Sequence, residues 1–278
     1  MVIDGRGISN KIKAEVKEEA AALRAQGIVP ALAVVLVGED PASKIYVGNK
    51  RKACEYTGIK SLSYKLPADA GEAELLGLID TLNKSREVSG ILVQLPLPGH
   101  MDEDKVINAI DPDKDVDCFH PVNVGRLWTG NPYFLPCTPA GVIELIKRSG
   151  FSISGKNCVV IGRSNIVGKP TAALLLQENG TVTMCHSKTQ NLKEICLGAD
   201  IIVVAVGQPK MLTGDMVKPG AIVIDVGMNR NEEGKLCGDA EFDAIVGHAA
   251  GISPVPGGAG LMTVAMLMKN CIKAARSM

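Results

Sequence analysis

The residues that could do chemistry begin with a tyrosine and a lysine four positions apart. Asp40 followed by Pro41 is typical of a capped helix start, so Tyr46 and Lys50 would share one helical face. Gln94 closes an apolar run, and a lone amide at the end of a buried strand needs a hydrogen-bond partner. We expect that partner to be Lys50, whose amino group could then transfer a proton. On spacing alone, an ordinary amphipathic helix with Lys50 in water is the simpler interpretation.

Two further carboxylates alternate in the acidic, proline-bounded loop at residues 111–121. Turn or capping chemistry is the ordinary role of such residues, and it suffices for Asp115. Asp117 precedes the hydrophobic pair Cys118 and Phe119 and is harder to explain in this way. A carboxylate there could accept two hydrogen bonds from the amino and ring N–H groups of a heterocycle.

A glycine-bounded turn between a strand and a helix indicates a phosphate site. The apolar residues 158–161 predict a buried strand, Gly162 and Gly168 bound the turn, and residues 171–178 predict a helix that ends before Gly180. Such a turn brings backbone close to a pyrophosphate, whose charge the helix N-terminus favours. The spacing is G-x5-G rather than the usual G-x-G-x-x-G, so a tight turn in any doubly wound domain explains it equally well.

The residues around this turn favour NADP over NAD. NAD sites place a carboxylate at the end of the next strand, on the ribose hydroxyl, but this strand ends with Cys185 and His186. Arg163 follows Gly162 directly, and Ser187 lies at the strand end. A guanidinium and a hydroxyl suit a 2′-phosphate. Arg163 could also be a solvated turn residue. However, the absence of a carboxylate at the strand end and the presence of Arg163 both favour NADP.

Two series of strands and helices would position these groups. The first series has predicted helices at residues 9–26, 41–54, 72–82 and 101–110 and strands at 31–37, 62–66 and 91–95. After a connector at 121–135 and a helix at 138–148, the second has strands at 157–161, 181–185, 201–205, 221–224 and about 250–253. Residues 254–260 are expected to be neither helix nor central strand, and residues 262–276 predict a final amphipathic helix.

This alternation predicts an α/β protein of two domains with a cleft between them. Ligands of open parallel sheets bind beyond the carboxyl ends of the strands. Lys50 follows the first strand, Gln94 closes the third, and Gly162 follows the first strand of the second series. We therefore expect all three to face one cleft.

Composition narrows the class of protein. The 278 residues carry 30 basic and 30 acidic side chains, and this balance argues against nucleic acid or a membrane surface as partner. A leader and an apolar run of membrane-spanning length are both missing, so we expect a soluble, cytoplasmic chain. The eight cysteines form no C-x-x-C pair and are expected to be free thiols in a reducing compartment. The four histidines are scattered, and no metal site is predicted.

Taken together, the motifs resemble those of the bifunctional methylenetetrahydrofolate dehydrogenase/methenyltetrahydrofolate cyclohydrolase family. The stretches that carry the resemblance are YVGNKRKACEYTGI from Tyr46, GILVQLPLP from Gly90, DKDVDCFHPVNVGRL from Asp113, PCTPAGVIELI from Pro136, GRSNIVGKP from Gly162, CHSKT from Cys185, DVGMN from Asp225 and SPVPGGAGLMTVAMLM from Ser253. They occur in order and cover nearly the whole chain.

The resemblance implies a function in one-carbon metabolism and an architecture. The enzyme would oxidise 5,10-methylenetetrahydrofolate with NADP⁺ and hydrolyse the methenyl product to 10-formyltetrahydrofolate. Residues 1–137 plus 262–278 would form the catalytic, folate-binding domain, and residues 138–261 a Rossmann-like NADP-binding domain. The implied partners are tetrahydrofolate derivatives and a second copy of the chain in a homodimer, without metal, nucleic acid or membrane.

The resemblance also implies residue roles. Lys50 would be the catalytic lysine with Gln94 as its partner, Tyr46 would stack on the folate's aminobenzoyl ring, and Asp117 would bind the pterin. The expected folate-binding set is Tyr46, Lys50, Val93, Gln94, Leu95, Asp117, Pro256, Gly257, Gly258 and Gly260. The expected NADP-binding set is Gly162, Arg163, Ser164, Ser187 and Met228, with Met228 on the nicotinamide side.

Four residues depart from the usual family motifs. Cys118 stands where glycine is usual, Met228 where isoleucine is common, and Ala259 and Leu261 where valine and proline are usual. If the family needs glycine at position 118 because the backbone there has a positive φ, Cys118 is strained. If it needs glycine only because the space is small, the Cys118 side chain narrows the pterin pocket.

Three rival functions can be tested against these motifs. Cys118 could abolish one of the two reactions and leave an enzyme with a single activity. A silent NADPH-binding sensor would need only the second domain, and the intact Tyr46, Lys50, Gln94 and Asp117 argue against it. An amino-acid or shikimate-type dehydrogenase would not need the PVPGG loop or the Gln94 strand.

Overall fold

The computed structural model describes residues 1–278, and the chain folds into two compact units. One unit comprises Met1–Asn10 and Thr138–Thr263, and we call it the nucleotide unit. The other, the catalytic unit, comprises Lys11–Cys137 and Val264–Met278. None of the helices is both long enough and apolar enough to cross a membrane.

The first ten residues belong to the nucleotide unit, whereas the expected domain limits keep residues 1–137 together. The physical reason is strand pairing at the edge of a sheet. Val2 forms a parallel β-bridge with Ile252, and the backbone N–H of Ile3 donates to the Ile252 carbonyl oxygen at 2.8 Å. These contacts hold the N-terminal segment beside the last strand of that unit.

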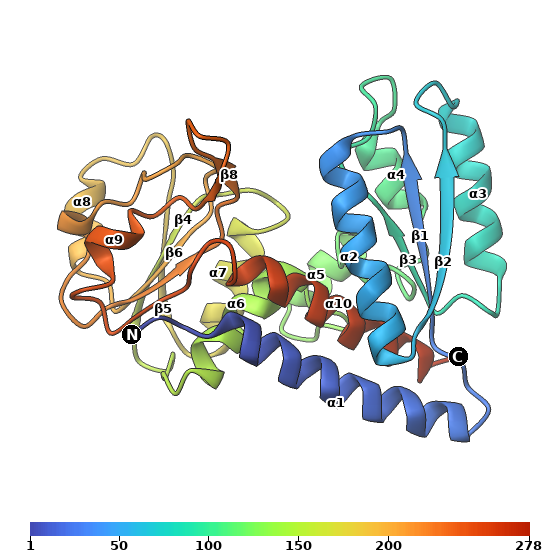
Figure 1. Ribbon diagram of the computed structural model, residues 1–278, viewed down its shortest axis with the longest axis horizontal. Helices are drawn as coiled ribbons and strands as arrows, with labels where there is room; N and C mark the ends of the chain where they lie inside the picture. The colour runs from blue at the N-terminus through green and yellow to red at the C-terminus, as the bar shows by residue number, and fades with distance from the viewer. The chain divides into compact units, whose positions relative to one another are not determined.

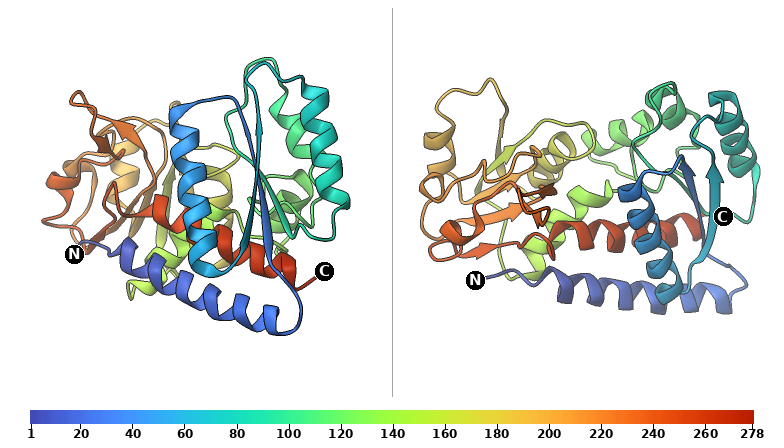
Figure 2. Two further views of the ribbon diagram at one scale, coloured as in Figure 1. Left: turned by 45° about the vertical axis from the view of Figure 1, so that its right-hand side comes forward. Right: turned by 45° about the horizontal axis from the view of Figure 1, so that its top comes forward.

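The catalytic unit is built on a three-stranded parallel sheet of order β2-β1-β3 (Figure 1). Its strands are β1 (Ala31–Val37), β2 (Lys60–Leu66) and β3 (Gly90–Val93), and its helices are α2 (Pro41–Thr57), α3 (Glu72–Lys84), α4 (Glu103–Ala109) and α5 (Pro121–Trp128). Every residue of β1 and β3 is buried, because parallel sheets are covered on both faces. α2 and α3 lie on opposite sides of this sheet (Figure 2).

The nucleotide unit contains a five-stranded parallel sheet of order β10-β7-β6-β4-β5. The strands are β4 (Asn157–Ile161), β5 (Thr181–Cys185), β6 (Ile201–Val204), β7 (Ile222–Asp225) and β10 (Gly251–Ile252), with helices α6 (Cys137–Arg148), α7 (Gly168–Gln177), α8 (Leu192–Leu197) and α9 (Phe242–Ile245). A short 3₁₀ helix, η1 (Gly214–Met216), and an antiparallel pair, β8 (Asn229–Arg230) and β9 (Leu236–Cys237), complete it. Two helices, α1 (Gly5–Ala25) and α10 (Ala259–Ala275), have residues in both units.

Every predicted strand is present, within about two residues at its ends. The segment predicted as a connector is in part a helix, α5, because His120 caps it. The Nδ1 atom of His120 accepts the backbone N–H of Val122 at 3.1 Å, and Pro121 occupies the first turn. Residues 254–260 were expected to be non-helical, but Ala259 and Gly260 already lie in the first turn of α10.

Candidate functional site

In the catalytic unit, Lys50 is held at the carboxyl edge of the sheet by a hydrogen bond to Gln94. Lys50 Nζ donates to Gln94 Oε1 at 3.0 Å, and the lysine is only 8% exposed. The Gln94 amide also donates to the Leu95 carbonyl at 2.6 Å, and the Gln94 backbone N–H donates to Val35. The expected Lys50–Gln94 hydrogen bond is confirmed, and the solvated-lysine alternative is wrong.

Local structure in α2 explains why Lys50 points inward. Asp40 caps the helix by accepting the backbone N–H of Ser43 at 2.7 Å, and this bond lowers the pKa of Asp40. Tyr46, Lys50 and Cys54 follow at helical spacing: Lys50 and Cys54 are buried, and Tyr46 is half-buried. Burial raises the pKa of the Tyr46 hydroxyl, so this ring offers the site a neutral face.

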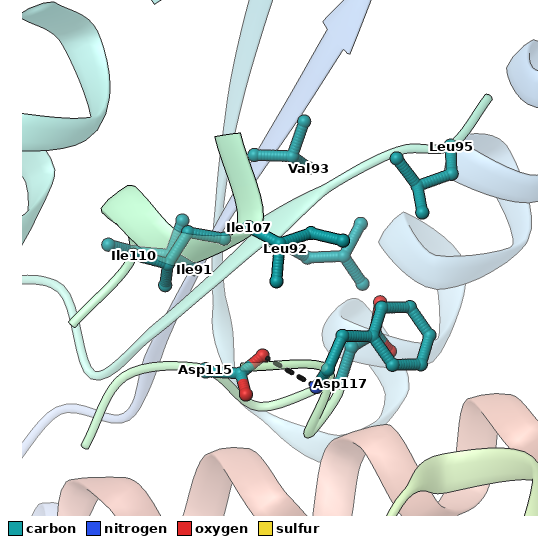
Figure 3. Close-up of a pocket in the computed structure, with 9 residues that line it drawn as sticks. Ile91, Leu92, Val93, Leu95, Ile107, Ile110, Asp115 and Asp117 are labelled. Carbon is teal, nitrogen blue, oxygen red and sulfur yellow. Dashed lines mark hydrogen bonds between the residues drawn. The ribbon is translucent and has the colours of Figure 1, made fainter. Parts of the chain in front are cut away.

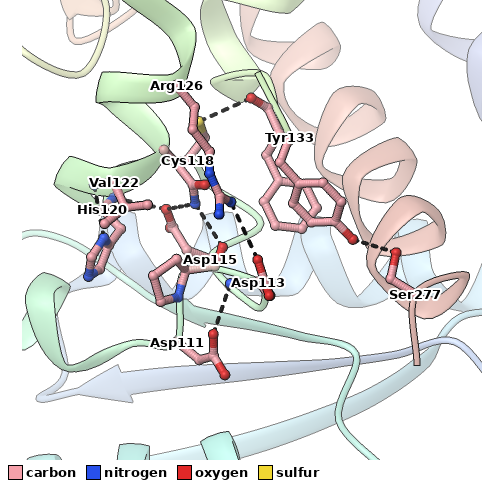
Figure 4. Close-up of polar contacts among 12 residues, drawn as sticks. Asp111, Asp113, Asp115, Cys118, His120, Val122, Arg126, Tyr133 and Ser277 are labelled. Carbon is pink, nitrogen blue, oxygen red and sulfur yellow. Dashed lines mark hydrogen bonds and ion pairs between the residues drawn. The ribbon is translucent and has the colours of Figure 1, made fainter. Parts of the chain in front are cut away.

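Asp115 organises the loop that carries the second pair of carboxylates (Figure 4). It is 2% exposed, and its carboxylate accepts the backbone N–H groups of Phe119 at 3.2 Å and His120 at 2.8 Å. The Asn123 amide donates to the same carboxylate at 3.0 Å. The turn-chemistry explanation offered for Asp115 is therefore confirmed. The Asp115 carboxylate accepts hydrogen bonds from donors of its own loop, and these bonds fix the backbone that carries Asp117.

Asp117 differs from Asp115 because no backbone donor neutralises its charge. Burial raises its pKa, and the nearby Lys50 ammonium and a hydrogen bond from the Cys137 thiol oppose that rise. It lines a small cavity of about 10 Å³ below the end of β3 (Figure 3). Asp115 also lines the cavity, and the remaining lining side chains are apolar: Ile91, Leu92, Val93, Leu95, Ile107, Ile110 and Phe119. The wall thus combines an apolar surface with a carboxylate that can accept hydrogen bonds.

The backbone at Cys118 is left-handed, with φ of 64°. Its thiol donates to the Phe134 carbonyl at 3.3 Å, and the residue is 1% exposed. The side chain is therefore packed behind the loop and is not part of the cavity wall beside Asp117. Of the two alternatives for this position, the structure supports backbone strain rather than a narrowed pocket.

We expect the variant Cys118→Gly to be more stable than Cys118→Ala by about 1 kcal/mol, because both lose the thiol but only glycine relieves the left-handed strain. Urea unfolding of the two variants measures this difference directly. Using alanine as the reference cancels the lost packing of the sulfur atom, which a comparison with the unmodified chain would include. An alanine variant as stable as the glycine variant would show that the loop adopts this conformation without strain.

In the nucleotide unit, the two glycines of the phosphate turn are required by close backbone packing. Gly162 has φ of 126°, and a methyl group there would lie 2.3 Å from the Ala205 carbonyl oxygen. A methyl group at Gly168 would lie 2.3 Å from the Gly162 carbonyl oxygen. The hydroxyl of Ser164 accepts the backbone N–H groups of Val167 and Gly168, both at 3.2 Å. The turn is thus fixed at the start of α7, a ten-residue helix.

Arg163 and Ser187 follow neighbouring parallel strands at the same edge of the sheet. Ile161 pairs with Cys185, and the Gly162 backbone N–H donates to the Cys185 carbonyl at 2.9 Å. Arg163 and Ser187 come two residues after this pair, and both are exposed. Arg163 takes part in no salt bridge of the chain, so its charge is available to an anion.

Met228 lies beside the PVPGG loop of the same unit. A methyl group at Gly260 would lie 3.1 Å from Met228 Cε, so the side chain reaches the start of α10. Behind the loop, a methyl group at Gly5 would lie 2.5 Å from the Gly257 carbonyl oxygen, and one at Gly258 would lie 2.7 Å from the Pro254 carbonyl oxygen. This packing fixes the loop that holds Pro256, Gly257, Gly258 and Gly260.

Sequence reasoning missed two buried carboxylates in the nucleotide unit. Asp225, at the end of β7, is 3% exposed, and Asp239 is fully buried. Burial raises the pKa of Asp225 to about 6, although backbone N–H donors from Ala240, Asp239 and Gly227 lower it. An aspartate that closes an apolar run, as in Ile222–Asp225, was a visible signal. Nothing near Asp239 in the sequence marks it as buried.

Comparison with known proteins identifies the family. The model of the tetrahydrofolate dehydrogenase/cyclohydrolase NAD(P)-binding domain matches residues 136–278, and that of the catalytic domain matches residues 3–117. The chain belongs to the tetrahydrofolate dehydrogenase/cyclohydrolase family. Its resemblance to this family, stated above from the motifs, is confirmed, as is the α/β fold with a parallel-sheet NAD(P)-binding domain.

Other members of the tetrahydrofolate dehydrogenase/cyclohydrolase family are similar along their whole length. The bifunctional protein FolD of Lachnoclostridium phytofermentans is 60% identical over 276 residues, covering 99% of this chain and 98% of that one. The crystal structure of the bifunctional FolD methylenetetrahydrofolate dehydrogenase/cyclohydrolase from Campylobacter jejuni matches with a TM-score of 0.98 at 50% identity, covering 100% and 99% of the two chains. FolD from Trypanosoma brucei, complexed with NADP cofactor and an inhibitor, matches with a TM-score of 0.94 at 42% identity, covering 100% and 97%.

Proposed function

We propose that the protein carries out both reactions of its family, with Lys50 as the group that transfers protons. It oxidises 5,10-methylenetetrahydrofolate with NADP⁺ and hydrolyses the methenyl product to 10-formyltetrahydrofolate. The observation that carries the proposal is the hydrogen bond at 3.0 Å between the buried Lys50 and the partly buried Gln94. The direct test supplies methylenetetrahydrofolate and NADP⁺ to the purified protein and follows the methenyl form as it accumulates and decays.

The residues of the nucleotide unit fit NADP. The Gly162–Gly168 turn opens α7, whose N-terminus favours a pyrophosphate, and the hydroxyl of Ser164 stabilises that turn. Arg163 and Ser187 lie at neighbouring strand ends where no carboxylate would repel a 2′-phosphate. When bound, the nicotinamide accepts a hydride. The protein's task in this step is to place the folate carbon against the ring, and Met228 is proposed to line that side.

In the hydrolytic step, water attacks the methenyl carbon and loses a proton, and the bond from that carbon to N5 of the folate then breaks as N5 gains a proton. Lys50 is the basic group that we assign to this transfer, directly or through a second water. Gln94 accepts a hydrogen bond from the lysine amino group and fixes its position, because the Gln94 amide is itself bonded to the Leu95 carbonyl. Gln94 therefore acts by orienting Lys50, and its removal should weaken catalysis less than removal of the lysine.

Folate recognition is assigned to the apolar wall and the polar groups around it. Asp117 is proposed to accept two hydrogen bonds from the pterin; burial raises the pKa of this carboxyl group, and the neighbouring Lys50 opposes that rise. Val93 and Leu95 flank Gln94 and offer apolar contact, and the half-buried ring of Tyr46 offers a face for stacking on the aminobenzoyl group. The loop containing Pro256, Gly257, Gly258 and Gly260 is proposed to cover the bound folate.

We expect Arg163→Ala to weaken NADP⁺ much more than NAD⁺. A charge-assisted hydrogen bond is worth about 1.5–3 kcal/mol, so kcat/KM for NADP⁺ should fall roughly tenfold to a hundredfold. Steady-state kinetics with both cofactors measures the ratio. Lys156→Ala is the matched control, since it removes an exposed cation just before β4, at the opposite end of that strand from Arg163. Equal losses with NAD⁺ and NADP⁺ would remove Arg163 from 2′-phosphate recognition.

Assembly and location are further parts of the proposal. A homodimer is in keeping with the position of β5 at the edge of the five-stranded sheet, where it pairs with β4 alone. A cytoplasmic location is supported by eight free cysteines, seven of them buried, as expected in a reducing compartment. Family membership disfavours a shikimate-type dehydrogenase. The hydrogen bond between Lys50 and Gln94 disfavours a protein that only senses NADPH, which would not need it.

A further inference from the structure

Asp239 is a saturated carboxylate at the carboxyl edge of the sheet in the nucleotide unit. Its Oδ2 accepts the backbone N–H groups of Val206 at 2.6 Å and Gly207 at 3.0 Å, and its Oδ1 accepts that of Gln208 at 2.8 Å. The side-chain amide of Asn229 donates to Oδ1 at 2.8 Å. Four donors therefore use the full accepting capacity of one fully buried carboxylate.

These four donors come from the two loops that follow β6 and β7. Residues 206–208 come just after β6, and Asn229, the first residue of β8, comes directly after the loop that leaves β7. Asp239 thus accepts hydrogen bonds from both segments. Glycines make the approach possible, because a methyl group at Gly227 would lie 2.3 Å from the Asp239 carboxyl group.

A second carboxylate fixes Asp239 in turn. Asp225 Oδ1 accepts the backbone N–H of Asp239 at 3.0 Å, and its Oδ2 accepts that of Ala240 at 2.8 Å. A methyl group at Gly238 would lie 1.8 Å from Asp225 Oδ2, so only glycine fits between the two acids. The backbone at Asp239 is therefore fixed by hydrogen bonds to a buried side chain at the end of β7.

Strand order places these loops under the nicotinamide end of the cofactor. In the order β10-β7-β6-β4-β5, a bound cofactor would have its pyrophosphate at the turn after β4, and Arg163 and Ser187 would hold its 2′-phosphate toward β5. The other half of the dinucleotide must then extend over β6 and β7. The loop after β6 already packs on the phosphate turn, where the Ala205 carbonyl leaves no room for a side chain at Gly162.

We propose that Asp239 is a positioning residue for hydride transfer. It fixes the loops after β6 and β7 in the position that lets the nicotinamide ring lie against the folate carbon. This inference rests on the proposed function, since it assumes that NADP binds across this edge. Asp239 itself is buried beneath the loops and acts only through Val206–Gln208 and Asn229.

The variant Asp239→Asn tests the inference, because its amide group would face two of the four N–H donors and lose both bonds. We expect dehydrogenase kcat/KM to fall at least about tenfold. The primary isotope effect with substrate deuterated at the one-carbon methylene should increase, because a misplaced ring makes hydride transfer rate-limiting. Hydrolysis of added methenyltetrahydrofolate, assigned to the catalytic unit, should stay within about twofold of the unmodified rate. Asp243→Asn, an exposed acid on α9, is the matched control and should change none of these quantities.

Asn229→Ala keeps the Asp239 carboxylate and removes one of its donors. We expect a smaller fall in dehydrogenase kcat/KM and a smaller rise in the isotope effect. This variant tests the inference even if Asp239→Asn fails to fold. A variant that loses both activities in parallel, with an unchanged isotope effect, would show a purely structural role and overturn the inference. Failure of the proposed function is a separate result, in which the unmodified protein itself does not oxidise methylenetetrahydrofolate with NADP⁺.

Discussion

Lys50→Met removes the hydrolysis of methenyltetrahydrofolate, lowering its rate by about 10²- to 10⁴-fold, the usual contribution of a positioned acid or base. Methionine replaces the apolar stem of the lysine with an unbranched apolar chain of similar length, so the change is mainly the loss of the amino group. Gln94 Oε1 loses the Lys50 amino group that donates to it at 3.0 Å. Because Gln94 is only partly buried, a water molecule can take the place of that donor. Hydride transfer needs no protein base, so dehydrogenase activity falls less, through lost positioning alone.

Lys52→Met is the matched control for this prediction. Lys52 lies on the same helix, two residues away, and is exposed, so its loss removes the same charge from α2 without touching Gln94. Methenyltetrahydrofolate decay and NADP⁺ binding, measured on both variants, separate the two activities. If Lys50→Met still hydrolyses methenyltetrahydrofolate at the unmodified rate, Lys50 does not transfer the proton.

Asp117→Asn weakens folate binding by about a hundredfold or more, because two charge-assisted hydrogen bonds to the pterin become weaker and one amide hydrogen faces a donor. The KM for methylenetetrahydrofolate rises in both reactions, whereas the affinity for NADP⁺ is unchanged. Asp113→Asn is a suitable control, since Asp113 is an exposed acid of the same loop that pairs with Arg126 at 3.4 Å. Unaltered folate kinetics in Asp117→Asn would remove this carboxylate from the binding site.

The same variant should be at least as stable as the unmodified protein at neutral pH. Burial raises the pKa of Asp117 above the value of 3.8 that it has when unfolded, so the folded state binds this proton more tightly than the unfolded state. The ionised carboxylate therefore costs stability once the pH rises above its folded pKa, and asparagine removes that cost. Urea unfolding at about pH 7 should favour Asp117→Asn, and the advantage should vanish below about pH 3.8, where both states carry the proton.

Much of the candidate site could be predicted because its signals are local in the sequence. Apolar runs such as Ala31–Val37 are long enough to specify buried strands, and parallel pairing then brings the strand ends to one edge. Gln94 was informative because an amide that closes an apolar strand needs a partner, and the helical spacing of Tyr46 and Lys50 supplied one.

Other features could not be predicted because their causes are tertiary. The helix α5 depends on a histidine cap, whereas the whole segment 121–135 is rich in glycine, proline and aromatic residues and so indicates a connector. The left-handed backbone at Cys118 depends on how Asp115 folds its loop. Asp239 is buried by donors that lie 10 to 33 residues away, a relation that no spacing rule describes. A polar residue in a turn-like segment is usually solvated, and only the fold shows that this one is not.

The central claim is that one chain produces the methenyl intermediate and hydrolyses it with Lys50. The most direct measurement mixes 5,10-methylenetetrahydrofolate with NADP⁺ and the purified protein, and follows NADPH and the methenyl form together by absorbance. We predict that the unmodified protein forms NADPH with a low, steady methenyl level, and that Lys50→Met forms NADPH more slowly while the methenyl form accumulates. NADPH formation without any decay of the methenyl form in the unmodified protein, or equal decay in Lys50→Met, would contradict the account.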